Sequence, residues 1–154
     1  MKKDTIYQNS DPKEGSFSFD AKVVPVFDDM IRRSVPGYPL LLQAQASMLK
    51  ELKPPKGLIL DLGCSTGNWY KKLESTGVDL EEYLGVDASP EMLSKFHEKS
   101  KNVNLLEADL ENWVLPTGNS VVAMNFTLQF LSLECRKRMI QEIFDGSLLL
   151  RMWM

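Results

Sequence analysis

Apolar residues follow a helical period in the N-terminal part of the chain. They recur at intervals of three and four in two groups, which are Val26, Phe27, Met30 and Ile31, and then Leu42, Ala46 and Leu49. Turn-forming residues at 34–38 separate the two groups, and Pro54 with Pro55 ends the second one. The pattern predicts a helical extension over residues 17–53, preceded by a loose polar lead-in over residues 1–16.

From residue 57 onward, short apolar runs alternate with helical segments. The runs are continuous, as expected for strands buried on both faces, and they cover residues 57–62, 82–87, 103–106 and 120–126. Gly77 suits the end of a helix after the first run, while Ser89 and Pro90 suit the start of a helix after the second. This order predicts an α/β fold with a Rossmann-like, doubly wound, mostly parallel sheet.

A last helix is predicted between Ser132, a suitable N-cap, and Gly146, a suitable stop. Its apolar residues recur at helical spacing. We expect its inner face to carry Met139, Ile140, Ile143 and Phe144.

Length and charge narrow the class of protein. The chain has 154 residues, enough for one domain, and its net charge of -3 gives no electrostatic reason to bind nucleic acid or an anionic membrane directly. Two cysteines are too few for a disulfide framework or a zinc cluster, so no metal site is predicted. No apolar run approaches membrane-spanning length and no secretory signal follows the N-terminus, so we expect a cytoplasmic protein.

The first apolar run leads into a turn of small residues between Gly63 and Gly67. Such a turn after a buried strand is typical of nucleotide-binding sheets, where ligands lie beyond the carboxyl ends of the strands. Asp87 ends the second run twenty residues beyond Gly67, at the spacing of an acid that accepts hydrogen bonds from ribose hydroxyls. The alternative role of Asp87 is to cap the helix that starts at Pro90.

Two further polar residues follow later strands. Asp109 comes after the third run, where its carboxylate could accept from an adenine amino group and Leu110 could supply a backbone N–H; the alternative is a solvated loop carboxylate. Asn125 lies near the end of the fourth run, and its amide offers a donor and an acceptor to a polar ligand group. The alternative is that Asn125 ties down the adjacent loop.

The glycine turn favours one of two cofactor classes. A dinucleotide needs a turn that cradles pyrophosphate, normally with a middle glycine, and Ser65 takes that place here. S-adenosylmethionine has no phosphates and tolerates a bulkier turn. The missing glycine therefore favours S-adenosylmethionine over a nicotinamide dinucleotide.

These residues carry a family resemblance. The string Asp61-Leu62-Gly63-Cys64-Ser65, together with the acids and Asn125, resembles class I S-adenosylmethionine-dependent methyltransferases. Two longer strings resemble carboxy-S-adenosyl-L-methionine synthase: the segment from Phe17 to Tyr38, which contains Arg33-Ser34-Val35-Pro36-Gly37-Tyr38, and Asn125-Phe126-Thr127-Leu128-Gln129-Phe130. The resemblance spans roughly residues 17–145 and implies a sheet of the class I methyltransferase type.

The resemblance also implies a reaction. Enzymes of this family use S-adenosyl-L-methionine and prephenate, and they form carboxy-S-adenosyl-L-methionine by adding the carbon dioxide released from prephenate to the deprotonated sulfonium methyl group. A partner enzyme uses the product to build 5-oxyacetyl uridine at the tRNA wobble position. Carried over by position, the cofactor site comprises Tyr38, Gly63, Cys64, Ser65, Asp87, Ala88, Asp109, Leu110 and Asn125. No catalytic residue is assigned.

The resemblance stops near Gly146. Residues 54–146 read as a partial cofactor-binding domain and residues 147–154 as a divergent tail, so we expect a C-terminally truncated member whose sheet ends after about strand 4 or 5. The open apolar edge of such a sheet favours association, which leaves a homo-oligomer as one expectation. The alternatives to a synthase are a general methyltransferase with the same cofactor and a non-catalytic remnant that binds it.

Overall fold

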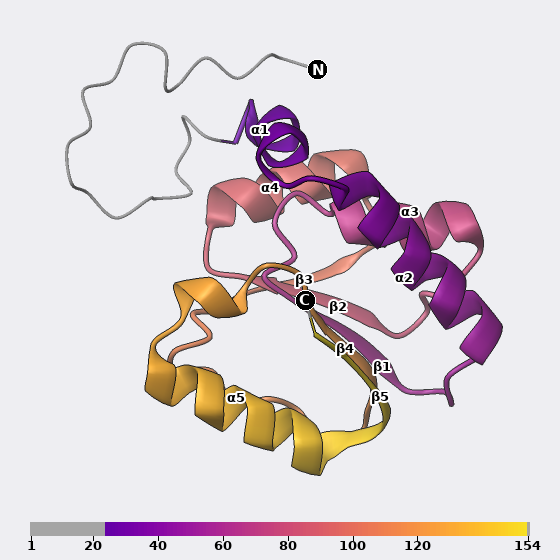
Figure 1. Cartoon of the computed structure of the whole chain (residues 1–154), viewed down its shortest axis with the longest axis vertical. Coiled ribbons are helices and arrows are strands. Elements are labelled where there is room, and N and C mark those ends of the chain that lie inside the picture. Colours follow the sequence, from indigo (N-terminus) through magenta and orange to yellow (C-terminus); the bar gives the residue numbers. More distant parts are fainter. Residues whose placement is uncertain (1–23, 154) are drawn as a thin grey trace.

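Five parallel strands form one sheet in the order β3-β2-β1-β4-β5 in the computed structural model (Figure 1). The structure describes the backbone of residues 24–153 and the side chains of residues 24–146. The strands are β1 (Leu58–Leu62), β2 (Tyr83–Asp87), β3 (Asn104–Glu107), β4 (Asn119–Met124) and β5 (Ser147–Trp153). The strand order reverses between β1 and β4, and in open α/β sheets a ligand binds at the carboxyl ends beside such a reversal.

Helices cover both faces of the sheet, which confirms the predicted doubly wound fold. They are α1 (Phe27–Ser34), α2 (Tyr38–Leu52), α3 (Asn68–Thr76), α4 (Pro90–Lys99) and α5 (Leu133–Gly146). In Figure 1, α1 to α4 lie on one side of the sheet and α5 lies on the other. Among the described residues, no helix is long and apolar enough to cross a membrane.

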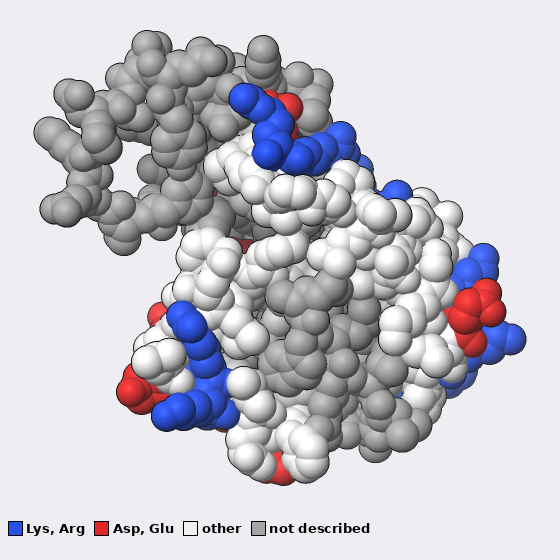
Figure 2. All heavy atoms as spheres, in the orientation of Figure 1, with Lys and Arg blue, Asp and Glu red and all other residues white. Residues whose placement is uncertain are grey.

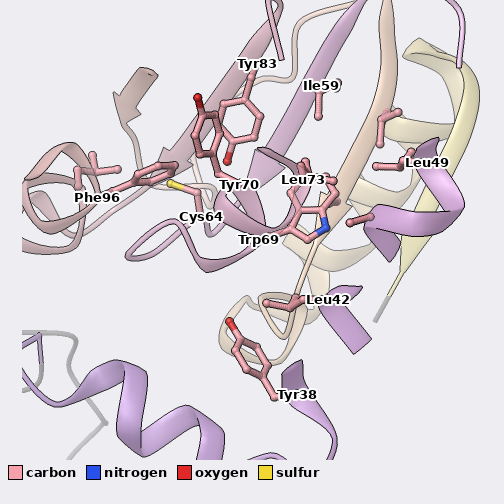
Figure 3. Close-up of a cluster of buried hydrophobic side chains, with 14 residues drawn as sticks. Tyr38, Leu42, Leu49, Ile59, Cys64, Trp69, Tyr70, Leu73, Tyr83 and Phe96 are labelled. Carbon is pink, nitrogen blue, oxygen red and sulfur yellow. The ribbon is translucent and has the colours of Figure 1, made fainter. Parts of the chain in front are cut away.

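Successive side chains of the central strands point to opposite faces and build two cores. Ile59 of β1 and Val121 of β4 face α2, α3 and α4 in a cluster that also contains Tyr83 and Phe96 (Figure 3). Leu60 packs with α5 in the second cluster. Since both faces of β1 and β4 are buried, these strands read as continuous apolar runs.

Local signals place the helix ends as predicted. Ser89 caps α4, because its hydroxyl oxygen accepts a 3.2 Å hydrogen bond from the backbone N–H of Met92. Gly77 ends α3 with a φ of 79°, a left-handed conformation that favours glycine. Ser132 accepts a 3.1 Å hydrogen bond from the backbone N–H of Cys135 at the start of α5.

The predicted inner face of α5 is partly wrong. Met139 and Ile143 are buried, but Ile140 and Phe144 are 45% and 62% exposed, and Cys135 takes a place in the core instead. Each residue turns the helix by about 100°, so Ile140 and Phe144 lie one step round from the face that meets the sheet. The apolar residues of α5 therefore cover a wider part of the helix surface than the part that is buried against the sheet.

The tail after Gly146 forms a strand. β5 pairs parallel to β4, with Asn119 opposite Ser147 and Met124 opposite Trp153, so β4 has neighbours on both sides. At the other end of the chain, the predicted lead-in over residues 1–16 and the start of the helical extension, residues 17–23, lie outside the described residues. The described part of the extension is helical, as predicted.

Candidate functional site

A cavity of about 630 Å³ lies at the carboxyl ends of the strands and is roofed by α1. The structure brings all nine residues of the predicted cofactor site to its wall. They are Tyr38, Gly63, Cys64, Ser65, Asp87, Ala88, Asp109, Leu110 and Asn125. Residues from four separate loops and one helix thus meet in one place, although what they bind is still a prediction.

The glycine turn is packed too closely against the 125–127 loop to accept a larger residue at its start. The backbone N–H groups of Gly63 and Cys64 donate to the carbonyl oxygen of Val86, which anchors the turn to β2. Gly63 has a φ of 78°, and a Cβ atom there would overlap the side chain of Thr127. Thr127 in turn donates a 2.7 Å hydrogen bond from its hydroxyl to the carbonyl of Leu62.

Ser65 adopts the backbone conformation that a glycine would favour at the middle of this turn. Its φ is 51°, in the left-handed region that few non-glycine residues enter. Its backbone N–H points to β2 and donates a 2.8 Å hydrogen bond to Oδ2 of Asp87. The turn therefore keeps the backbone path of a glycine turn while presenting a hydroxymethyl group.

Asp87 ties two loops together and also lines the cavity. Its Oδ1 atom accepts a 3.0 Å hydrogen bond from the backbone N–H of Ser89, while Oδ2 accepts from Ser65. Burial raises the pKa of Asp87 and the backbone hydrogen bonds partly offset that rise. A carboxylate oxygen can accept two hydrogen bonds, so both oxygens keep capacity for ligand hydroxyls. The loop-tying role is present, and the ribose role remains a prediction.

Asp109 and Leu110 form a short turn that α5 holds in place. Asp109 is exposed, and its Oδ1 atom accepts from the backbone N–H of Glu111 at 3.0 Å. Leu110 is buried, and its carbonyl accepts a 2.6 Å hydrogen bond from Nη2 of Arg138. The carboxylate of Asp109 thus stabilises its own loop at the edge of the cavity.

Asn125 brings an unpaired buried donor to the cavity wall. Its Oδ1 atom accepts a 2.8 Å hydrogen bond from Nε2 of Gln45 on α2, whereas its own Nδ2 atom is buried without a hydrogen-bond partner among the described residues. A buried N–H group that lacks an acceptor costs free energy. A ligand oxygen at this position would remove that cost.

Tyr38 begins α2 and places a buried phenol at the cavity. Burial raises the pKa of Tyr38 to about 12, although a hydrogen bond with the Asn68 side chain lowers it, so the hydroxyl stays protonated and able to donate. The ring centroid of Phe126 lies 6.0 Å away. Phe126 itself has a φ of 59°, which bends the chain at the end of the loop after β4.

Two features of the site escape the sequence reasoning. Asp61 lies in the quoted glycine-turn string but carries no predicted role, and it is buried at the cavity with a 2.7 Å hydrogen bond from the Tyr83 hydroxyl. The preference of buried acids for a partner is the signal that could have identified it. Asp28 on α1 accepts from Thr66 and Asn68, and no local pattern marks that contact.

The residues present fit S-adenosylmethionine. Asp87 offers acceptors suited to a ribose diol, and the buried Nδ2 of Asn125 offers a donor suited to a carboxylate. Aromatic residues including Phe126 and Trp69 line the same space, which suits an adenine or a sulfonium group. Ser65 stands in the turn where a pyrophosphate cradle has its middle glycine.

Comparison with known proteins identifies a family. A family model described as a methyltransferase domain matches residues 59–146. The carboxy-S-adenosyl-L-methionine synthase of Vibrio campbellii is 37% identical over 153 residues, which cover 93% of this chain and 61% of that protein. The synthase of Desulforapulum autotrophicum is 38% identical over 154 residues, covering 95% of this chain and 62% of that protein. The chain thus spans about three fifths of the length of these relatives.

Solved structures share the fold at low identity. An amino pentose methyltransferase from Micromonospora echinaspora with bound SAM superposes with a TM-score of 0.63 and 15% identity, over 92% of this chain and 60% of that chain. Magnesium protoporphyrin IX methyltransferase from Synechocystis, also with bound SAM, gives a TM-score of 0.61 and 18% identity, over 79% of this chain and 65% of that chain. The fold is that of class I methyltransferases, as predicted.

Proposed function

Because this chain belongs to the methyltransferase-domain family, we propose that its cavity binds S-adenosyl-L-methionine and that the chain acts as a carboxy-S-adenosyl-L-methionine synthase-like transferase. The observation that carries the proposal is the meeting of all nine predicted residues at one cavity beside the strand-order reversal. The similarity to synthases over 93% of the chain supports the choice of reaction within the family.

The described residues suggest a pose for the cofactor. Asp87 would accept from the ribose hydroxyls, and the turn at Asp109 and Leu110 would hold the adenine. Asn125 would donate from Nδ2 to the amino-acid carboxylate, which satisfies the unpaired donor. Tyr38 would place its ring against the sulfonium and its hydroxyl toward a carboxylate. Because burial raises the pKa of Asp61 to about 7, a positively charged ligand beside the turn would favour its ionised form.

The proposed second substrate is prephenate. S-adenosyl-L-methionine would supply the sulfonium-bound methyl carbon, which loses a proton and forms a bond to carbon dioxide. Prephenate would supply the carbon dioxide by losing it together with its ring hydroxyl as hydroxide, which leaves phenylpyruvate, and the hydroxide and the methyl proton would combine as water. The described residues would bind and orient the cofactor. The product would serve the modification of the wobble uridine of tRNA through a partner enzyme, since the net charge of -3 does not favour direct contact with RNA.

Mass spectrometry tests the proposal directly. The purified chain is incubated with S-adenosyl-L-methionine, with and without prephenate, and products are separated by mass. Carboxy-S-adenosyl-L-methionine formed only with prephenate would support the synthase activity. If calorimetry shows no binding of S-adenosyl-L-methionine or S-adenosylhomocysteine to the folded chain, the proposed site is wrong. Binding without turnover would assign the chain a binding role alone.

One observation favours a second candidate, a general methyltransferase with the same cofactor. The described lining of the cavity contains no Lys, Arg or His and four acidic side chains, which are Asp87, Asp109, Glu111 and Asp61, the last with a pKa raised to about 7 by burial. On the face shown in Figure 2, Lys and Arg side chains gather over α1 and over α5, and none of them lines the cavity. A dicarboxylate such as prephenate is repelled by such walls. Methyl transfer to an acceptor without prephenate would support this candidate instead.

A further inference from the structure

Asp28 joins the roof of the cavity to the glycine turn. Its Oδ1 atom accepts a 2.7 Å hydrogen bond from the hydroxyl of Thr66 and a 2.9 Å hydrogen bond from Nδ2 of Asn68. Its Oδ2 atom accepts a 2.8 Å hydrogen bond from the ammonium group of Lys99, which also donates to the carbonyl of Thr66 at 3.1 Å. One carboxylate on α1 thus connects α1, the turn and α4.

This polar cluster is stronger than an ordinary surface ion pair. The side chains of Asp28 and Lys99 are only 25% and 16% exposed, and Thr66 is buried. Burial alone would raise the pKa of Asp28, but the hydrogen bonds from Lys99, Thr66 and Asn68 outweigh it and lower the pKa overall. Asp28 is therefore ionised at neutral pH and accepts three charge-assisted hydrogen bonds.

The helix that carries Asp28 is short. It has eight residues, and its N-cap, Val26, offers no side-chain hydrogen bond, so it is too short to be stable alone. Apolar contacts add to the polar cluster, because Phe27 packs with Met92 of α4 and Ile31 packs against the main core. Since Phe27, Met30 and Ile31 also line the cavity, the position of this helix sets the shape of the roof.

The cluster also reaches a residue predicted to touch the ligand. Asn68 donates to Asp28, lines the same cavity as Tyr38 and lowers the pKa of the Tyr38 hydroxyl, so Asp28 fixes the amide group that acts on Tyr38. Thr66 follows Ser65 directly, so Asp28 also restrains the turn whose N–H groups face β2. We propose that Asp28 is a positioning residue: acting through Thr66 and Asn68, it fixes the glycine turn and Tyr38 for the amino-acid part of the bound cofactor.

This inference rests on the proposed cofactor site, and it predicts a selective effect. Asp28→Asn keeps the size of the side chain but removes the charge and one acceptor oxygen. We expect the Kd for S-adenosylhomocysteine to rise about tenfold, the size of one lost charge-assisted hydrogen bond. The Kd for adenosine, which lacks the amino-acid part and would be held by Asp87 and the 109–110 turn, should change less than twofold. A defect in folding alone would weaken both ligands equally.

Asp29→Asn is the matched control, because it makes the same change one residue along the same helix, at an acid that lies 3.5 Å from Arg33 of its own helix. If Asp28→Asn does not fold, Thr66→Val is tested in its place, because it keeps the volume of the side chain and removes the hydroxyl group that donates to Asp28. Selective loss of S-adenosylhomocysteine affinity in either variant supports the proposal. An unchanged ratio of the two Kd values overturns it. If the unmodified chain binds neither ligand, the proposed function fails instead.

Discussion

The hydroxyl group of Tyr83 donates a 2.7 Å hydrogen bond to Oδ2 of Asp61, and both side chains are buried. Burial raises the pKa of Asp61 to about 7, because the hydrogen bond from Tyr83 offsets only part of the lost hydration, and the nearby charge of Asp87 adds to the rise. The folded protein therefore holds a proton on Asp61 at a pH where an exposed aspartate has lost it.

Asp61 is expected to make the protein less stable as the pH rises from about 4 to about 7. Over that range the folded state binds more protons than the unfolded state, because the pKa of Asp61 is about 7 when folded and near 3.8 when unfolded. The free energy of unfolding then falls by about 1.4 kcal/mol per pH unit from this group. Urea denaturation at pH 5 and pH 7 measures the difference.

Asp61→Asn isolates this contribution, since asparagine cannot titrate but can still accept from Tyr83. Between pH 5 and pH 7, the free energy of unfolding of the variant should fall by roughly 2–3 kcal/mol less than that of the unmodified protein. Other titrating groups are the same in both proteins and cancel in the comparison. Parallel pH profiles would show that Asp61 is ionised in the folded state throughout this range.

Asp87→Ala should weaken both ligand binding and folding. Loss of the ribose contacts is expected to cost about 1.5–3 kcal/mol of S-adenosylhomocysteine affinity, measured by calorimetry on folded protein. The backbone N–H groups of Ser65 and Ser89 both donate to this carboxylate, so its loss also removes two hydrogen bonds of the fold. We therefore expect the free energy of unfolding to fall by about 1–3 kcal/mol as well.

Glu107→Ala is the control for Asp87, because Glu107 is the exposed acid paired with it in the register of β2 and β3. It should change neither affinity nor stability by more than about 0.5 kcal/mol. Unchanged ligand affinity in a folded Asp87→Ala protein would remove Asp87 from the binding site.

Gly63 and Gly37 separate backbone strain from steric overlap. Their φ angles are 78° and 77°, but a Cβ atom at Gly63 would overlap Thr127, whereas a Cβ atom at Gly37 has nothing within 4 Å. Gly37→Ala should lower the free energy of unfolding by about 1–2 kcal/mol, the cost of the left-handed conformation. Gly63→Ala should lower the free energy of unfolding by at least about 1 kcal/mol more than Gly37→Ala does. In the double variant, Thr127→Ala should restore part of that difference. Equal losses at the two glycines would contradict the overlap.

Signals within a few residues were sufficient to predict most of the fold. The Ser89–Pro90 start of α4 and the Gly77 end of α3 depend on backbone groups close in sequence, and both are confirmed. The ends of strands shift by one or two residues: β4 ends at Met124 rather than at Phe126. Phe126 instead takes a positive φ in the following loop, a conformation that apolar periodicity does not reveal.

The candidate site also combines residues that local signals predict with contacts that they do not predict. Residues at strand ends were predictable, because the carboxyl ends of parallel strands meet at one edge. Contacts between distant segments were not: Asp28 meets Lys99 across 71 positions, and Gln45 meets Asn125 across 80. The burial of Cys135 in place of Ile140 is similar, since the sheet decides which side of α5 is inside.

Arg138 is expected to hold the predicted adenine-binding turn. Its guanidinium donates to three carbonyls, those of Leu110, Glu111 and Trp113, and pairs with Glu142 at 3.0 Å. Arg138→Ala removes all three hydrogen bonds while leaving the residues that would touch the ligand. We expect the Kd for adenosine, measured by calorimetry, to rise severalfold, and the free energy of unfolding to fall by about 1–2 kcal/mol.

Two variants on the same helix make the test of Arg138 specific. Lys137→Ala removes a charge from an exposed neighbour and should leave both quantities unchanged. Arg138→Lys keeps the charge but not the planar guanidinium. A single ammonium group cannot reproduce hydrogen bonds that two guanidinium nitrogens donate, so this variant should recover only part of the adenosine affinity and of the free energy of unfolding. Full recovery with lysine would mean that charge alone matters. An unchanged adenosine Kd in Arg138→Ala would mean that the turn holds its shape without the Arg138 guanidinium.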